Sequence, residues 1–202
     1  MNAMNKVERT LKQVETGVQP NTVNGVAVDQ LVQTINAIKA TPAIAKFKFR
    51  VRNQWTEGAR NSSSVDTYHG AGQNLSRPQP FVLEADEPSV LLGKDTAPNP
   101  VEHLLHALAA CLTTSMVYHA AAQGIQIQEV ESSVEGDLDL HGFLELDRNV
   151  RTGYQGIQVK FKIKADVSDD QLEKISQLGP RYSPVFDNLT KGVPVSVTAE
   201  RL

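Results

Sequence analysis

The chain contains a single cysteine, Cys111, and its chemistry is the most informative feature of the sequence. A lone cysteine forms no disulfide within its own chain, so it is either a small packing residue or a reactive thiol. It lies within residues 98–115, an almost uncharged run with the composition of a helix. The function of the chain depends on which of these two interpretations holds.

The predicted helix supplies no group that would activate Cys111. None of the residues three or four positions away is a histidine, and His106 and His119 lie well to the side. The thiol is also three turns from the start of the helix, too far to gain from the helix dipole. Apolar burial alone would keep the thiol protonated and inert, so a reactive Cys111 requires a cation from another element.

Two charged residues are further candidates for a site. Glu102 follows Asn99 at the spacing of a capping box. On a continuous helix Glu102 is about 13–14 Å from Cys111 along the axis and on the opposite side, so a joint role requires a break in the helix, an intervening residue or a second subunit. Arg60 lies in a predicted turn over residues 57–61, where most arginines point into solvent.

Other motifs favour neither a metal nor a cofactor. His103 and His106 have a compatible spacing, but the glutamate and third ligand of a zinc protease are missing. Gly70-Ala71-Gly72 lacks the strand-to-helix context of a dinucleotide-binding loop. We therefore expect no metal site and no cofactor.

Composition points to an ordinary globular protein. The 202 residues are 40% hydrophobic and 21% charged, with a formal net charge of −3. Such a chain has no basic surface for nucleic acid or for an anionic membrane, and we expect neither partner. One cysteine fits the reducing cytoplasm, which is the predicted location. Residues 101–122 are the most apolar stretch, and the charged and histidine side chains within it favour a buried helix over a membrane span.

The first part of the chain has helical periodicity. Apolar residues recur at helical spacing over residues 7–18 and again over residues 28–38. The second helix follows the turn pair Asn24-Gly25 and stops at Thr41-Pro42. We therefore expect residues 1–44 to form an N-terminal helical extension and residues 45–202 to form the main domain.

The main domain starts with a two-residue periodicity. Strands are predicted over residues 47–52, 63–68 and 81–84, with a turn at 57–61 and a loop over 69–80 that is rich in glycine, proline and serine. A long helix then begins near Pro100 and ends before Gly124. This helix is apolar on nearly every side, so one thin sheet could not cover it and a second subunit is expected.

More strand-like runs follow the long helix, over residues 125–134, 137–140 and 157–164. Ser168 begins a helix that Gly179-Pro180 is expected to end, and a short helix over 185–190 precedes a final strand over 193–197. Consecutive strands joined by turns form antiparallel sheets, so the fold class is α+β.

Several of these segments together resemble the OsmC/Ohr family of thiol-dependent hydroperoxide reductases. Residues 99–111, with the sequence NPVEHLLHALAAC, resemble the central-helix signature of the family, and residues 86–95 resemble the segment that leads to it. Residues 182–185 and 193–195 resemble its C-terminal segment and last strand. The first 44 residues resemble an extension found in one OsmC-like branch. The resemblance implies antiparallel sheets wrapped around a long central helix in an intertwined homodimer.

The resemblance also implies roles for the candidate residues. Cys111 would attack the distal oxygen of an organic hydroperoxide, and Arg60 would stabilise the thiolate and the alkoxide that develops. Glu102 would orient the arginine, although one branch of the family places this acid one residue earlier, where the present chain has Val101.

The chain departs from the family at Ser183, which stands where the family has its second, resolving cysteine. A serine cannot form the disulfide that would regenerate the thiol. Two outcomes remain open. Cys111 works as a one-cysteine peroxidase whose sulfenic acid is reduced by an external thiol, or the chain is a non-enzymatic protein that binds a small ligand or has another role in stress.

Overall fold

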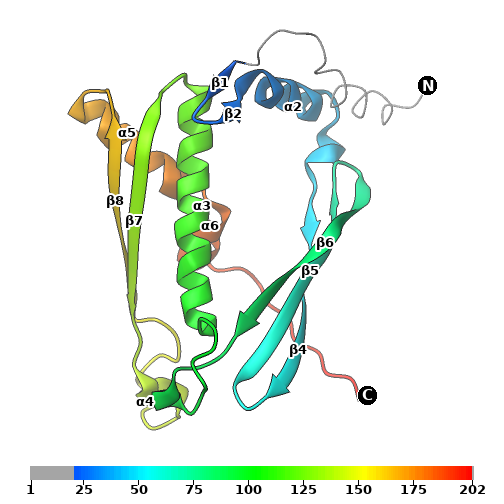
Figure 1. Cartoon of the computed structure of the whole chain (residues 1–202), viewed down its shortest axis with the longest axis vertical. Helices are drawn as coiled ribbons and strands as arrows, with labels where there is room; N and C mark the ends of the chain where they lie inside the picture. The colour runs from blue at the N-terminus through cyan, green and yellow to red at the C-terminus, as the bar shows by residue number, and fades with distance from the viewer. Residues whose placement is uncertain (1–20, 202) are drawn as a thin grey trace.

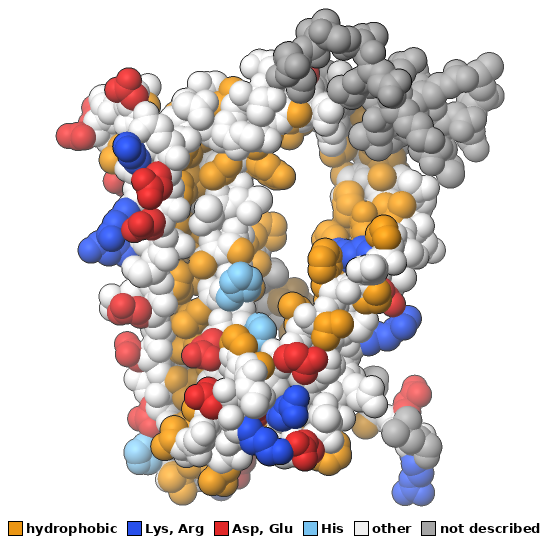
Figure 2. Space-filling model, in the orientation of Figure 1, with side chains coloured by type: hydrophobic (Ala, Val, Ile, Leu, Met, Phe, Trp, Pro, Cys, Tyr) orange, Lys and Arg blue, Asp and Glu red, His pale blue; other side chains and the backbone are white. Residues whose placement is uncertain are grey.

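The structure of the chain is a computed structural model that describes residues 21–201. The chain forms two layers that face each other (Figure 1), and the space-filling view in Figure 2 shows a hollow between them. One layer is a two-stranded sheet covered by helices, and the other is a four-stranded sheet. Both sheets are antiparallel and helices separate them along the chain, which confirms the predicted α+β class. The helix expected over residues 7–18 lies outside the described residues.

The described chain begins with a small unit of β1 (Thr22–Val23), β2 (Val26–Ala27) and α2 (Val28–Ala40), followed by the short helix η1 (Pro42–Ala45). The helix predicted over residues 28–38 is therefore confirmed. Asn24 and Gly25 form the turn between the two strands with φ angles of 53° and 75°, as a type I′ hairpin requires.

The side chain of Asn24 fastens this unit to the main domain. Its amide donates to the carbonyl of Ile125 at 2.9 Å, and its oxygen accepts from the amide of Ile127 at 2.7 Å. Both partners lie just after the long central helix. The N-terminal unit is thereby fixed at the end of that helix, at the top of the view in Figure 1.

The four-stranded sheet consists of β3 (Lys48–Phe49), β4 (Arg52–Glu57), β5 (Arg60–Gly70) and β6 (Gln73–Ala85). The predicted turn over 57–61 is confirmed in a shorter form, at residues 58–59, and the strand over 63–68 lies within β5. The strand expected over 47–52 is confirmed only in part, because β3 covers residues 48–49 and β4 begins at Arg52. The loop predicted over residues 69–80 is wrong, because β5 continues to Gly70, turns at Ala71 and Gly72, and returns as β6. The prolines of this segment fall within residues 77–80, where the pairing of β5 with β6 is interrupted, so their missing N–H groups cost no ladder hydrogen bond.

The central helix, α3, spans Pro100–Ala122 and begins as the sequence predicts. The Asn99 side chain accepts from the amide of Glu102, and the Glu102 carboxylate accepts from the amide of Asn99, both at 2.8 Å. This reciprocal pair is a capping box, with Pro100 in the first turn. At the other end Gly124 adopts a positive φ of 70° just after the helix, the conformation that favours glycine there.

The second sheet and its helices follow α3. They are β7 (Ile127–Asp137), α4 (Leu140–Phe143), β8 (Gly156–Ala165), α5 (Asp169–Tyr182) and α6 (Pro184–Lys191). The strands over 125–134 and 157–164, the helix that begins at Ser168 and the short helix over 185–190 are confirmed. The strand predicted over 137–140 is wrong beyond its first residue, because Asp139 accepts from the amide of His141 at 2.9 Å and begins α4 instead.

Two predictions near the C-terminus are also wrong: the end of the helix that begins at Ser168, and the final strand. Gly179-Pro180 does not stop α5, which continues to Tyr182 because the helix packs against α3 and this packing outweighs the bond that proline removes. The strand expected over 193–197 does not form in the single chain. Val195 and Val197 are exposed there, because none of the three sheets of the described residues pairs with this segment.

The core lies between α3, α5 and the second sheet. Its buried members are Met116, Ala120, Ile127, Ile175 and Leu178. By length and composition α3 is the one helix of the described residues that could cross a membrane, a test that core helices of soluble proteins also pass. It packs on β7, α5 and α6.

Candidate functional site

Cys111 lies in the middle of α3, where it is partly exposed and free. Among residues 21–201 no hydrogen-bond donor and no charged group contacts its sulfur. Exposed residues recur every fourth position on the same helix, at Glu102, His106, Ala110, Thr114 and Tyr118. The helix therefore has an uncovered side next to the thiol.

Arg60 is the first residue of β5, in the turn that joins it to β4. Its Nη1 lies 3.8 Å from Oε1 of Glu57, and the same oxygen accepts from Nζ of Lys94 at 2.5 Å. Lys94 lowers the pKa of Glu57 below its ordinary value, first by this hydrogen bond and then by its charge, and the charge of Arg60 adds a smaller effect. Arg60 therefore forms a long ion pair with a carboxylate of its own hairpin.

Glu102 lies in the first turn of α3 and is engaged in the capping box with Asn99. The β4–β5 turn and the start of α3 both lie in the lower half of the view in Figure 1. Within one chain no hydrogen bond or ion pair of the described residues joins Arg60, Glu102 and Cys111 to one another. The predicted site residues thus lie on separate elements and form no closed cluster within the described part of a single protomer.

Asp86, which the sequence analysis did not single out, organises the loop between β6 and α3. Its carboxylate accepts from the amides of Glu87, Lys94 and Thr96 at 2.9, 3.2 and 3.2 Å, and from the Thr96 hydroxyl at 2.8 Å. The side chain is 1% exposed. Burial raises the pKa of Asp86, but these hydrogen bonds together bring it below its ordinary value. The carboxylate stays charged and fixes the backbone of Lys94.

A second link joins the start of α3 to the four-stranded sheet. Nε2 of His103 lies 2.8 Å from the carbonyl oxygen of Glu84 in β6, and the Glu84 carboxylate accepts from the hydroxyl of Ser62 in β5 at 2.8 Å. His103 therefore has a structural contact, and the described residues hold no cluster of three or more metal-ligating side chains. The strand that carries Arg60 is placed relative to α3 by these bonds.

Ser183 lies between α5 and α6 and is 2% exposed. Its hydroxyl accepts from the amide of Phe186 at 3.1 Å and so begins α6. The preceding residue, Tyr182, stacks on His119 of α3 with ring centroids 3.6 Å apart. Ser183 therefore has a structural role at the junction between two helices that pack on α3.

The sequence profile described as OsmC-like protein matches residues 93–198, more than half of the chain. The chain belongs to the OsmC-like family. The match includes Glu102, Cys111 and Ser183, whereas Arg60 lies outside it.

Solved structures share the OsmC-like fold. The OsmC-like protein from Mycoplasma pneumoniae superposes with a TM-score of 0.56 at 18% identity, over 72% of this chain and 89% of that one. An organic hydroperoxide resistance protein OsmC from Legionella pneumophila gives a TM-score of 0.51 at 15% identity, over 71% and 91% of the two chains. At these identities the comparison establishes the fold. No curated protein matches the chain by sequence.

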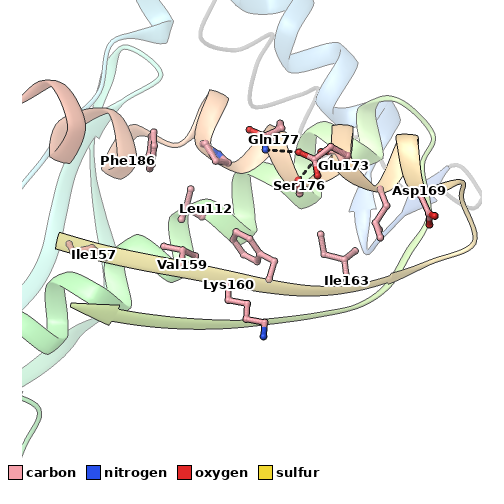
Figure 3. Close-up of a pocket in the computed structure, with 13 residues that line it drawn as sticks. Leu112, Ile157, Val159, Lys160, Ile163, Asp169, Glu173, Ser176, Gln177 and Phe186 are labelled. Carbon is pink, nitrogen blue, oxygen red and sulfur yellow. Dashed lines mark hydrogen bonds between the residues drawn. The ribbon is translucent and has the colours of Figure 1, made fainter. Parts of the chain in front are cut away.

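The OsmC-like chain also has an open groove, of about 720 Å³, between β8 and the helices α5 and α6. Figure 3 shows apolar side chains of β8 and Leu112 of α3 on one side and the polar face of α5 on the other. On that face Glu173 accepts from the side-chain amide of Gln177 at 3.1 Å. The groove reaches α3 at Leu112, the residue after Cys111 in the sequence.

Proposed function

We propose that the chain is a thiol-dependent peroxidase that reduces organic hydroperoxides, with Cys111 as the reacting residue. The observation that carries this proposal is a free, partly exposed cysteine in the middle of α3, inside the segment that defines family membership. The name of the Legionella relative supports the substrate class. We place the protein in the cytoplasm, where a lone cysteine stays reduced.

In the proposed reaction the Cys111 thiolate attacks the distal oxygen of a hydroperoxide, R–O–OH. An S–O bond forms while the O–O bond breaks, and the alkoxide leaves and takes up a proton to become an alcohol. The sulfur is oxidised to a sulfenic acid. Because Ser183 cannot form a disulfide, an external thiol attacks the sulfenic acid and releases water, and a second thiol molecule cleaves the resulting mixed disulfide.

We further propose that the protein works as a homodimer in which Arg60 lies close to the partner's Cys111. Two features support this arrangement: the side of α3 next to Cys111 is uncovered, and in its own chain Arg60 contacts Glu57 rather than the thiol. A guanidinium beside the sulfur would stabilise the thiolate and the alkoxide that develops as the O–O bond breaks.

The experiment that tests the proposal is rapid mixing of the reduced protein with cumene hydroperoxide. Cys111 should be consumed far faster than free cysteine at the same pH, and one equivalent of alcohol should form per thiol. Addition of a small thiol should restore turnover, and Cys111→Ser should abolish it. A Cys111 that reacts no faster than free cysteine would exclude the peroxidase.

The alternative is a non-enzymatic small-ligand-binding or stress-associated protein of the same fold. The groove beside α5 and the absence of a cation next to Cys111 in the described part of a single chain favour it. The two functions differ in the pH at which alkylation of Cys111 is half-maximal. A midpoint below that of free cysteine supports the peroxidase, and a midpoint above it supports the binding protein.

A further inference from the structure

Three charged side chains from two separate segments meet at the turn that carries Arg60. Glu57 ends β4, Arg60 begins β5, and Lys94 comes from the loop before α3. A single oxygen of Glu57 lies 2.5 Å from the Lys94 ammonium and 3.8 Å from the Arg60 guanidinium. Glu57 is thus the one carboxylate in the described residues that forms an ion pair with Arg60.

Lys94 is well placed to hold Glu57, because its own backbone is fixed. The amide of Lys94 donates to the buried carboxylate of Asp86 at 3.2 Å, and Thr96, two residues later, makes two further bonds to the same oxygen. A lysine on a loop normally loses much side-chain and backbone entropy when it forms an ion pair. Because the hydrogen bonds to Asp86 already order the backbone of Lys94, the ion pair with Glu57 costs less backbone entropy, which favours a persistent contact.

Glu102, the acid that the family resemblance suggested for this task, has a different partner. Its Oε2 accepts from the amide of Asn99, and its own amide donates to the Asn99 side chain. To reach Arg60 the carboxylate would leave the capping box and expose the first turn of α3. The position one residue earlier is Val101, which has no charge. The start of α3 therefore offers no uncommitted acid.

We propose that Glu57, held by Lys94, is the carboxylate that positions Arg60 at the thiol site. This inference rests on the proposed peroxidase function. One Arg60 nitrogen faces Glu57, which leaves the other N–H donors of the guanidinium free to point at the thiolate. Glu57 is a positioning residue, since it acts on the sulfur only through Arg60.

The substitution Glu57→Gln separates positioning from a simple effect of charge. Removal of a negative charge near Arg60 would by itself strengthen the positive field at the thiol and shift the alkylation midpoint of Cys111 to lower pH. Loss of the group that orients Arg60 does the opposite. We expect the midpoint to move to higher pH and the oxidation of Cys111 by cumene hydroperoxide to slow roughly tenfold to a hundredfold.

Three further variants complete the experiment. Lys94→Met should slow oxidation in the same direction, and its effect should not add to that of Glu57→Gln. Glu57→Asp, which keeps the charge, should recover part of the rate. Glu131→Gln is the matched control, because Glu131 forms an exposed ion pair with Lys162 at 3.2 Å on the other sheet, and it should react like the wild type.

The outcomes distinguish this inference from the proposed function. If Arg60→Met is as fast as the wild type, the role of Arg60 itself is refuted. If Arg60→Met is slow while Glu57→Gln matches Glu131→Gln, the inference is overturned and the peroxidase stands. A slow Glu102→Gln beside a normal Glu57→Gln would assign the task to Glu102. Urea unfolding of each variant shows whether a slow rate reflects loss of the fold.

Discussion

Tyr154 connects the second sheet with the first turn of α3. Its hydroxyl donates to the carbonyl of Val101 at 2.9 Å. Its ring packs closely on Gly136 of β7, since a Cβ added to that glycine would lie 2.7 Å from the ring. Burial, and to a smaller extent the charge of Glu102, raises the pKa of Tyr154 above its ordinary value. The neutral phenol is therefore the form that fits this position.

Replacement of Tyr154 by phenylalanine keeps the ring and removes one hydrogen bond. The free energy of unfolding should fall by about 1 kcal/mol, measured by urea denaturation near pH 7. Because the folded pKa is raised, the contribution of the phenol is complete below the unfolded pKa and is lost as the pH rises through the folded one. The difference between wild type and variant should shrink in that alkaline range. Equal stabilities near pH 7 would contradict the role of this bond.

His119 gives the fold a pH dependence of the opposite kind. Burial, and then the charge of Arg181, lowers the pKa of His119 below its ordinary value while the ring stacks on Tyr182. The unfolded chain therefore binds more protons at this residue, and stability rises with pH from the lowered pKa up to about the ordinary value of 6.5.

The corresponding variant is His119→Phe, which keeps an aromatic ring against Tyr182 and cannot be protonated. The wild type should lose stability between pH 7.5 and pH 5.5, and His119→Phe should lose less; unfolding midpoints at the two pH values measure this. His141→Gln is the control, because the exposed His141 ring pairs with Asp139 at 2.6 Å on a short helix, and its removal should not reduce the loss of stability at low pH. A variant that retains the full pH dependence would show that another group is responsible.

The residues of the candidate site could be predicted only in part. Cys111 can be singled out by its residue type, and the capping role of Glu102 follows from its spacing from Asn99, so both can be predicted from the sequence of one helix. Glu57, Lys94 and Asp86 owe their importance to contacts between segments 8 to 37 residues apart. No local pattern predicts such pairs, since each of these residues is an ordinary charged residue in its own segment.

At the scale of elements, prediction succeeded where interactions between residues close in the sequence determine the secondary structure. Asn24-Gly25, the Asn99 capping box and the alternation over 157–164 all specify structure within a few residues. Prediction was worst where packing overrides local preference. The proline inside α5 is tolerated because of the contact with α3. In the glycine- and proline-rich segment 69–80, residues 73–76 join a strand because β5 pairs with them.

The packing of α5 on α3 depends on a close approach at Gly179. A Cβ there would lie 3.1 Å from the carbonyl oxygen of Leu112, which belongs to the backbone of α3 and cannot move alone. Gly179→Ala should therefore separate the helices slightly and cost about 1–3 kcal/mol in the free energy of unfolding.

Gly156 supplies the matched control for this prediction. A Cβ at Gly156, in β8, meets no atom within 4 Å, so Gly156→Ala should change stability by no more than about 0.5 kcal/mol. Chemical denaturation of the two variants under the same conditions makes the comparison. If both variants behave alike, the close approach of α5 to α3 does not limit the side chain at position 179.

On the scale of the whole molecule, a single chain leaves too much apolar surface in water. In the described residues nine hydrophobic side chains are buried, whereas twenty-one large hydrophobic ones are exposed. Figure 2 shows apolar side chains around the hollow between the two layers. Exposed apolar patches of this extent mark an interaction surface, which supports the proposed homodimer.

The four-stranded sheet carries the clearest part of this surface. Phe49, which is 70% exposed, stacks between Phe47 and Tyr68 with centroids 5.9 Å from each. The only tryptophan, Trp55, lies on the same sheet and is 68% exposed. A second protomer that covers this sheet would move both side chains out of water, so the fluorescence of Trp55 can report the association.

We therefore expect a dimer in sedimentation experiments, with Trp55 emission at shorter wavelength than free tryptophan and an unfolding midpoint that rises with protein concentration. Phe49→Glu places a charge on the apolar surface and should yield monomers whose Trp55 emission is shifted to the red. Thr152→Glu adds the same charge to an exposed loop and should remain dimeric. A wild type that sediments as a monomer at every concentration, with Trp55 in water, would refute the dimer; it would also leave the thiol without the partner's Arg60 and so favour the binding protein over the peroxidase.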